Sequence, residues 1–403
     1  MKPLTIGIAG AGIGGLAAAA ALAQAGHDVT VYDQFDTPRP VGSGLVIQPV
    51  GQAVLARIGA LDVAEAHGAQ ITHMLGHAAG KRLPILDVRY APRKSTPRHG
   101  LALHRAALFH AVHLAALTTG VTLVASHEVT GVTDTAQRQL IFANGDTSPP
   151  YDLIIDAAGA GSPLSPLKAR ALPYGAIWGT VDWPKDAPLP DHQLSQRYEA
   201  ARRMVGVLPI GLLPGGTTRK AALFWSLTRP ELETWRTTPI EAWKADASTL
   251  WPDAAPYLAD VTCHGDMTAA FYSHGSLRTP VARGLIHIGD SAHRASPQLG
   301  QGANMALLDA WALAQALTAG ADLPEALARY HKSRRWHLWA YQAMSALFTP
   351  LYQSHSRVLP ALRNHLLAPM AQIPPAPRLL SRLVCGDLLP PLQAGLAKGM
   401  KAP

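Results

Sequence analysis

Three glycines near the start of the chain have the spacing that a phosphate group requires of a protein backbone. Gly10, Gly12 and Gly15 stand between an apolar run at residues 4–9 and an alanine-rich segment that ends near Gly26. Gly10 permits a sharp turn, Gly12 has no Cβ to keep a pyrophosphate away, and Gly15 lets a helix pack closely on a strand. The free N–H groups and the positive dipole end of the predicted helix favour phosphate binding.

An acidic residue follows this turn at the distance typical of dinucleotide-binding proteins. Residues 28–32 alternate and are rich in β-branched side chains, which predicts a strand that ends at Asp33. Asp33 can accept hydrogen bonds from the ribose hydroxyls of an adenosine group. Strand, turn, helix and second strand make a complete βαβ unit, which favours dinucleotide binding over a purely structural turn. The unit does not distinguish NAD from FAD.

A second motif, far along the chain, favours a flavin. Residues 284–288 predict a strand that ends in Gly289-Asp290, and a glycine-rich turn at 296–304 and a helix at 303–317 follow. A buried turn that caps a helix is the structural alternative. Together with the first motif, these residues resemble the single-component FAD-dependent flavoprotein monooxygenases, aromatic hydroxylases of the para-hydroxybenzoate and salicylate hydroxylase type.

The resemblance implies a cofactor site and a reaction. Asp290 would bond a ribityl hydroxyl of FAD, and the backbone of the glycine-rich turn would face the pyrimidine edge of the flavin. A helix N-terminus stabilises the negative charge of reduced flavin without a cationic side chain. Pro297 would wall the ring where oxygen reacts, as the one expected catalytic residue. The reaction implied is insertion of one oxygen atom from O2 into a small aromatic or related electron-rich substrate, through a flavin C4a-hydroperoxide and with NAD(P)H as reductant.

Two further segments match the family pattern. Residues 42–49 resemble the loop beside the isoalloxazine ring, and Arg105 stands where the family has an arginine near the FAD phosphates. The cofactor-binding residues that follow from the motifs and the resemblance are Gly10, Gly12, Ile13, Gly14, Gly15, Asp33, Gln34, Arg39, Gly44, Leu45, Arg105, Val129, Ala158, Gly159, Asp290, Gly300, Gly302, Ala303 and Asn304.

One motif departs from the family. The stretch at residues 152–162 aligns with a pattern associated with FAD and with NAD(P)H-dependent reduction, but Ala158 replaces its inner aspartate and Asp156 replaces its first glycine. Either Asp156 takes over part of the polar role, or the reductive step differs. In the second case the flavin is reduced by its substrate, by a separate reductase, or by a nicotinamide in an altered pose.

The substrate pocket is expected between the flavin and a β-rich lobe. The residues predicted to line it are Trp178, Asp182, Leu208, Trp225 and Pro297. Trp178 and Trp225 can stack on a planar substrate or fill the core, and Asp182 can deprotonate a phenol or lie on a surface loop. His293, beside the Gly-Asp motif, is expected to be a structural partner, and no metal site is expected.

The pattern of predicted elements indicates an α/β protein. We expect a Rossmann-like three-layer FAD-binding domain from residues 1–72, 98–173 and 269–330, an antiparallel substrate domain from 73–97 and 174–268, and a helical C-terminal region at 331–403. Residues 204–213 and 220–227 predict an antiparallel pair of strands.

Composition supports a well-packed globular chain. Of 403 residues 48% are hydrophobic and 15% charged, and two cysteines, far apart, fit no metal or redox spacing. Glycines interrupt the apolar N-terminus, unlike an export signal, and no apolar stretch reaches the roughly 20 residues of a membrane span. We therefore expect a cytoplasmic monomer or homodimer whose partners are a small aromatic substrate and O2, and not nucleic acid.

The net charge of +8 is concentrated at the C-terminus. From Arg329 onward ten Lys and Arg residues face one acid, Asp387, a balance of 10 − 1 = +9. Such a region can contact nucleic acid, an anionic membrane or an acidic partner. No basic run exceeds two residues, which favours the solvated face of packed helices.

Three other classes of protein remain possible from the sequence. One is an FAD oxidase or dehydrogenase on the same fold, and another is a regulatory module that binds flavin or NAD. A flavin halogenase is disfavoured because its Trp-x-Trp-x-Ile-Pro signature is absent.

Overall fold

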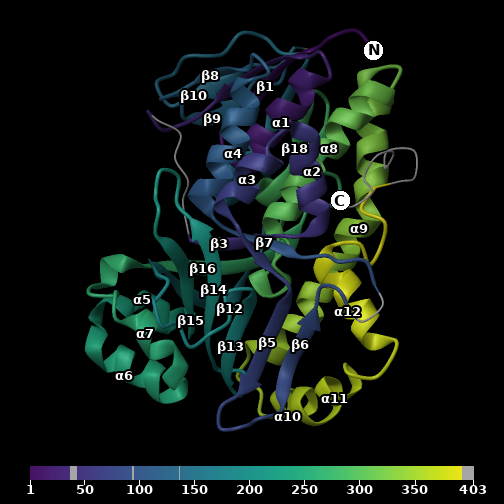
Figure 1. Ribbon diagram of the computed structural model, residues 1–403. Coiled ribbons are helices and arrows are strands. Elements are labelled where there is room, and N and C mark those ends of the chain that lie inside the picture. Colours follow the sequence, from purple (N-terminus) through teal and green to yellow (C-terminus); the bar gives the residue numbers. More distant parts are fainter. Residues whose placement is uncertain (37–42, 93–94, 136, 393–403) are drawn as a thin grey trace.

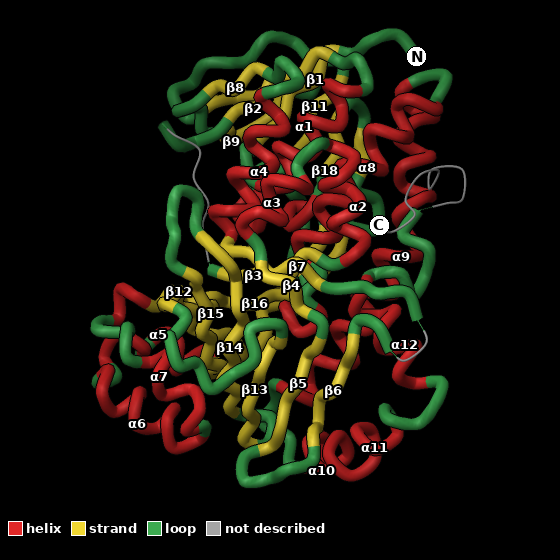
Figure 2. The backbone as a smooth tube through the Cα atoms, in the orientation of Figure 1, coloured by secondary structure: helices red, strands yellow, loops and turns green. Residues whose placement is uncertain are grey.

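The computed structural model describes residues 1–36, 43–92, 95–135 and 137–392 (Figure 1). Its strands form two large sheets, which Figure 2 shows as two separate groups, with helices beside and between them. The first sheet contains, in spatial order, β17 (Val281–Ala282), β18 (Leu285–His287), β11 (Leu153–Asp156), β1 (Thr5–Ala9), β2 (Asp28–Tyr32) and β8 (Thr122–Val124).

The six-stranded sheet is the middle layer of the predicted FAD-binding domain. Its strands are parallel except for β17 at one edge. Successive residues of a strand point to opposite faces, so Ile155 packs with the helical layer while Ile154 packs on the other face. That other face is covered by the predicted hairpin, β9 (Val129–Val132) and β10 (Leu140–Phe142). The three-layer prediction is confirmed.

The second large sheet is mostly antiparallel. Its eight strands are, in spatial order, β19 (His293–Arg294), β16 (Met267–Ser276), β12 (Arg170–Asp182), β15 (Arg219–Thr228), β14 (Arg203–Leu212), β13 (Gln193–Glu199), β5 (His73–Ala78) and β6 (Pro84–Arg89). β14 and β15 are the predicted antiparallel pair. A small sheet between the two large ones contains β3 (Gly44–Ile47), β7 (Gly100–His104) and β4 (Ala69–Ile71).

The helices fall into three groups. Those of the FAD-binding domain are α1 (Ile13–Gln24), α2 (Pro49–Ile58), α3 (Leu61–His67), α4 (Arg105–Leu117) and α8 (Gly302–Ala319). One face of the eight-stranded sheet packs against α5 (Arg229–Glu233), α6 (Ile240–Leu250) and α7 (Ala255–Leu258). The C-terminal group is α9 (Leu323–Tyr352), α10 (Val358–Leu362), a π-helical turn (Arg363–Leu367), α11 (Ala368–Met370) and α12 (Ala376–Cys385).

Three of the predicted domain boundaries fall inside regular elements. The boundary at 173 cuts β12, the boundary at 268 cuts β16, and the boundary at 330 cuts α9, which runs unbroken for 30 residues. A strand or helix that belongs to two layers carries no turn signal where it passes from one to the other. We therefore propose one domain around each large sheet, without boundaries at residues 173, 268 and 330.

The C-terminal helices cover the second face of the eight-stranded sheet. Leu351, Tyr352 and Val384 share a hydrophobic core with strand residues such as Ile85 and Leu208. Two of the basic residues counted there are buried, so the prediction of a solvated face is wrong for them. Arg334 is 2% exposed and Arg363 is 1% exposed, and both lie inside the molecule. Among the described residues no helix has the length and apolar character needed to cross a bilayer.

A buried histidine on α9 stays uncharged. Nδ1 of His337 accepts a hydrogen bond from the Arg334 guanidinium (3.3 Å), and its Nε2 donates to the carbonyl of Gly386 (2.8 Å). Burial, and then the positive charge of Arg334, lower the pKa of His337 from 6.5 to about 3. Protonation would place a second cation against the guanidinium.

We therefore expect stability to fall as the pH drops from 7 to 5. Because the unfolded chain protonates His337 near pH 6.5 and the folded chain only near pH 3, the free energy of unfolding decreases by about 1.4 kcal/mol per pH unit between these values. Urea denaturation at both pH values should show that His337→Gln loses about 2 kcal/mol less than the wild type. An equal loss in both proteins would contradict this assignment.

Candidate functional site

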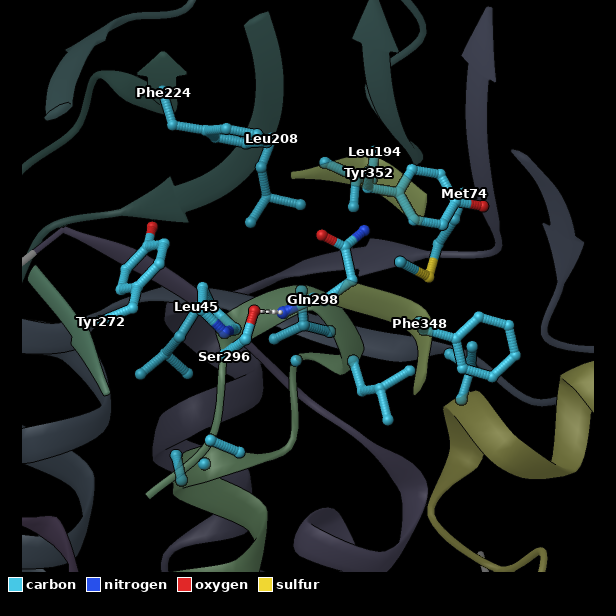
Figure 3. Close-up of a pocket in the computed structure, with 18 of the residues that line it drawn as sticks. Leu45, Met74, Leu194, Leu208, Phe224, Tyr272, Ser296, Gln298, Phe348 and Tyr352 are labelled. Carbon is cyan, nitrogen blue, oxygen red and sulfur yellow. Dashed lines mark hydrogen bonds between the residues drawn. The ribbon is translucent and has the colours of Figure 1, made fainter. Parts of the chain in front are cut away.

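A single long cavity joins the two large sheets. It has a volume of about 730 Å³, within the range of ligand and cofactor sites. One end is lined by the first turn of α1 and the first turn of α8, and the other end by strands of the eight-stranded sheet and the C-terminal helices. Figure 3 shows the part of the cavity between Leu45 and Ser296 on one side and Leu208 and Phe224 on the other.

The first glycine motif builds one end of this cavity. Gly10 has a φ of +101°, and a Cβ there would lie 2.7 Å from the carbonyl oxygen of Ala157. A Cβ on Gly15 would lie 2.0 Å from the carbonyl oxygen of Gly10. A Cβ on Gly12, by contrast, would meet no atom within 4 Å, and Gly12 lines the cavity. Gly10 and Gly15 thus serve packing, while Gly12 leaves space for a ligand.

The second glycine motif builds the other wall. Ser296 and the turn Pro297–Leu299 lead to Gly300, whose φ of +61° suits glycine, and α8 begins at Gly302. Two helix N-termini therefore face one cavity, each with N–H groups that have no acceptor within the helix. This arrangement favours an anion or an electron-rich ring. Together with the space at Gly12 and the nearby Arg105, it fits the phosphates and the flavin of FAD.

Most of the predicted cofactor residues line the cavity. Those on its surface are Gly12, Ile13, Gly14, Gly44, Leu45, Arg105, Gly159, Asp290, Gly300, Gly302 and Ala303. Those that do not line it are Gly10, Gly15, Asp33, Gln34, Val129, Ala158 and Asn304. Arg39 lies outside the described residues. For all of these residues, contact with FAD stays a prediction.

Two of the predicted cofactor-binding residues form hydrogen bonds that fix the backbone around the cavity. The carboxylate of Asp33 accepts hydrogen bonds from the N–H groups of Ala11 (2.8 Å) and Phe35 (3.0 Å) and so fixes the glycine turn. Asn304 is fully buried, accepts from the N–H of Gln48 (2.8 Å) and donates to the carbonyl of Gly300 (3.0 Å). Its amide joins the flavin-side turn to the loop after β3, which is a positioning role.

The altered motif has a structural use. Asp156 is fully buried, and its Oδ1 accepts hydrogen bonds from the N–H of Ala158 (3.1 Å) and the hydroxyl of Ser162 (2.7 Å). Its Oδ2 bonds Nδ1 of His287 (2.7 Å). The carboxylate thereby fixes the turn that presents Gly159 to the cavity, and it does not itself line the cavity.

A buried ionic cluster lies directly behind the Gly-Asp motif. Asp309 bonds His293 (2.6 Å), Arg334 (2.8 Å) and the N–H of Gly289 (3.0 Å). Burial alone would raise the pKa of the Asp309 carboxyl, but the charges of His293 and Arg334 outweigh burial and hold that pKa below its usual range. His293 is 5% exposed and contributes to this cluster, in keeping with its expected structural role.

The substrate end of the cavity is aromatic and apolar. Trp178 stacks on Phe224, with ring centroids 4.6 Å apart, and donates its indole N–H to the hydroxyl of Tyr272 (3.0 Å). Leu208 and Pro297 also line this end, as the sequence predicts. Pro297 is exposed toward the cavity.

Two of the predicted pocket residues lie elsewhere, and the prediction is wrong for them. Trp225 points to the opposite face of β15 from Phe224 and packs edge-on against Trp243, with centroids 6.5 Å apart. Asp182 is four residues beyond Trp178 on β12, about 13 Å along the strand, and pairs with Lys220. Neither side chain lines the cavity.

Several lining residues were not predicted. They are Met74, Leu194, Gln196, Tyr272, Gln298, Phe348 and Tyr352, among others. Alternation along β16 does not single out Tyr272, because its neighbours Phe271 and Ser273 also line the cavity, whereas Gln298 lies within the predicted glycine-rich turn. Nothing in the local sequence of α9 indicates that Phe348 and Tyr352 reach a site formed by residues near 74 and 194.

A protein-family model described as an FAD binding domain matches residues 4–345 of the chain. The chain belongs to this family. The resemblance to flavoprotein monooxygenases drawn from its motifs is confirmed, since the relatives include such enzymes. FAD is thus both the cofactor named by the family and the one that the two glycine motifs fit.

Three comparisons illustrate the relationship. A Rhodococcus erythropolis protein named as a 2-heptyl-3-hydroxy-4(1H)-quinolone synthase is 29% identical over 350 residues, covering 81% of this chain and 83% of the relative. An FAD-dependent urate hydroxylase of Klebsiella pneumoniae is 25% identical over 344 residues, covering 83% and 86%. The structure of Klebsiella pneumoniae HpxO complexed with FAD and uric acid superposes with a TM-score of 0.77 at 20% identity, covering 95% and 97%. This last likeness shows the shared fold.

Proposed function

We propose that the protein is an FAD-dependent monooxygenase that inserts one oxygen atom from O2 into an aromatic or heteroaromatic ring, with NAD(P)H as reductant. The observation that carries the proposal is the continuous cavity, in which a glycine-lined end leads directly into an aromatic pocket. Relatives named as a synthase of a quinolone and as a hydroxylase of urate, both heterocyclic rings, support it. Bound FAD would supply the activation of O2, as a C4a-hydroperoxide.

The residues of the chain would position the flavin and the substrate and exclude water from the site. The first turn of α8 offers N–H groups to the flavin, and Pro297 and Leu45 line the same cavity. Leu208, Phe224 and Trp178 supply flat or apolar contacts that exclude water from the ring.

Two measurements test the proposal. Purified holoprotein should be yellow, and a bound ring compound should stimulate NAD(P)H oxidation with 18O from O2 appearing in the product. Oxidation of substrate without incorporation of 18O would instead assign an FAD oxidase or dehydrogenase.

The source of electrons has two candidates besides NAD(P)H. Ala158 offers no carboxylate, and the neighbouring Asp156 is committed to Ala158, Ser162 and His287. These contacts favour testing a separate reductase or reduction by the substrate beside NAD(P)H. Anaerobic mixing with NADH, with NADPH, or with substrate alone distinguishes the routes by which of them bleaches the flavin.

Tyr272→Phe should weaken binding of a ring ligand about tenfold. The substitution removes the hydroxyl that accepts the Trp178 N–H, so the ring of Trp178 loses the contact that orients it over the cavity. One hydrogen bond is worth about 1 kcal/mol, and a buried donor left unpaired adds to that loss. The dissociation constant can be followed through the ligand-induced change in flavin absorption.

Tyr257→Phe is the matched control for this substitution. Tyr257 is fully buried but packs in the core on the opposite face of the sheet. We expect its ligand affinity to equal that of the wild type. Equal affinities in all three proteins would remove Tyr272 from the site.

A further inference from the structure

The cavity continues well beyond the space above the glycine-rich turn. Figure 3 shows Tyr272 and Phe224 toward one end, and Met74, Leu194, Phe348 and Tyr352 toward the other, with Gln298 between them. Leu367, Ala368 and Leu380, from the C-terminal helices, also line it. We call this part, beyond Gln298, the apolar extension. It is continuous with the part of the cavity beside Tyr272 and Phe224.

The charged groups of the apolar extension already have partners. Arg363 donates from Nη1 to the carbonyl of Leu351, from Nη2 to the carbonyl of Ala200, and from Nε to the side chain of Asn364, each at 2.9 Å. The carboxylate of Asp87 bonds Nε2 of His73 at 2.7 Å. The remaining charged residues that line the described cavity, Arg105, Asp290 and Arg294, belong to its glycine-lined end.

The side-chain amide of Gln196, which also lines the cavity, has partners within the protein too. Gln196 accepts a hydrogen bond from the hydroxyl of Tyr198 (2.9 Å) and directs its amide N–H toward the sulfur of Met204 (3.3 Å). A carboxylate placed in the extension would therefore lose its hydration, and the one described cation there, Arg363, already donates its hydrogen bonds to Leu351, Ala200 and Asn364. An apolar chain would gain about fourfold in affinity for each buried methylene.

We infer that the substrate is a neutral ring compound with an apolar tail of several carbons, whose ring lies beside Tyr272 and whose tail lies in the apolar extension. This inference rests on the proposed function for the position of the ring. It names a substrate class: tailed, uncharged ring compounds, as opposed to small aromatic acids.

A homologous series of probes tests the inference. The FAD-loaded protein is titrated with 4-methyl-, 4-propyl-, 4-pentyl- and 4-heptylphenol, and binding is followed through the flavin absorption. We expect the dissociation constant to fall about fourfold per methylene over most of the series. A probe with the heptyl length but a terminal carboxylate should bind at least tenfold more weakly than 4-heptylphenol. Affinity independent of chain length, or equal affinity of the carboxylate, would overturn the inference.

A pair of variants distinguishes binding in the apolar extension from nonspecific binding of hydrophobic probes. Ala368→Trp places a large ring in the extension and should reduce the ratio of the methyl to the heptyl dissociation constant at least tenfold. Ala346→Trp makes the same change at an exposed position of α9 outside the cavity, and should keep the wild-type ratio. The same ratio in both variants would mean that the tail binds elsewhere, and the inference would fall.

The two proposals fail in different ways. If 4-heptylphenol binds with the expected chain-length dependence but no 18O enters any product, the oxygenase function is wrong and the tail site stands. If short phenols are hydroxylated with no gain from a tail, the oxygenase function stands and the tail site is wrong.

Discussion

Gly12→Asp should yield a folded protein that no longer retains FAD. A Cβ at this position meets no protein atom within 4 Å, and the backbone φ of −75° is open to any residue, so the free chain tolerates the side chain. The carboxylate would, however, stand at the N-cap of α1, in the space that the pyrophosphate needs. We expect FAD affinity to fall at least a hundredfold, because a like charge repels the phosphates and cancels the favourable helix dipole.

The result is read from two measurements on the same sample. Circular dichroism and the thermal midpoint of the apoprotein report folding, and the ratio of flavin to protein absorption reports the cofactor. Gly216→Asp, in the exposed turn between β14 and β15, is the matched control and should remain yellow. If Gly12→Asp retained stoichiometric flavin, the cofactor would bind elsewhere and the assignment of this end of the cavity would be wrong.

Asp309→Asn should destabilise the fold by about 3–5 kcal/mol. The substitution keeps the shape of the side chain but removes the negative charge that Arg334, 2% exposed, and His293, 5% exposed, share. Breaking a buried ion pair by removing one partner is costly because the remaining charge stays buried and uncompensated. An amide has one acceptor oxygen where the carboxylate has two, so either the bond to Arg334 or the bonds to Gly289 and His293 would be lost, and losing the latter would loosen the Gly-Asp motif.

Urea denaturation of the holoprotein and the apoprotein measures both effects. Glu241→Gln, which breaks the exposed pair with Lys244, should change the free energy of unfolding by less than about 1 kcal/mol. A loss in Asp309→Asn no larger than in this control would show that the cluster is solvated and that its charges are not coupled.

The two glycine motifs could be read from the sequence because their meaning is local. A glycine turn between a strand and a helix specifies its own geometry, and the cofactor end of the cavity follows from two such turns. The three-layer domain and the antiparallel pair of β14 and β15 were also predicted from local patterns. Local sequence could not show that the side chains of Asp33 and Asn304 form hydrogen bonds with other parts of the protein, since these bonds depend on where residues distant in sequence come to lie.

The substrate pocket was less predictable for two physical reasons. Of the neighbours Phe224 and Trp225, only one can face the cavity, and both faces of β15 are buried, so composition does not reveal which one does. The C-terminal helices contact segments that are distant in the sequence, as in the hydrogen bond from Ser381 to the carbonyl of Tyr90, 291 residues apart. No local pattern in a single sequence predicts a contact between residues that far apart.

The position of α12 also affects the order in which the molecule assembles. Contacts between residues that are distant along the chain form slowly, because closing a long loop costs entropy before any contact repays it. The βαβ unit at the N-terminus closes early, whereas Val384 reaches the cavity only after nearly the whole chain has left the ribosome. During synthesis, a nascent chain therefore has its phosphate-binding turn well before it has a closed pocket for a substrate.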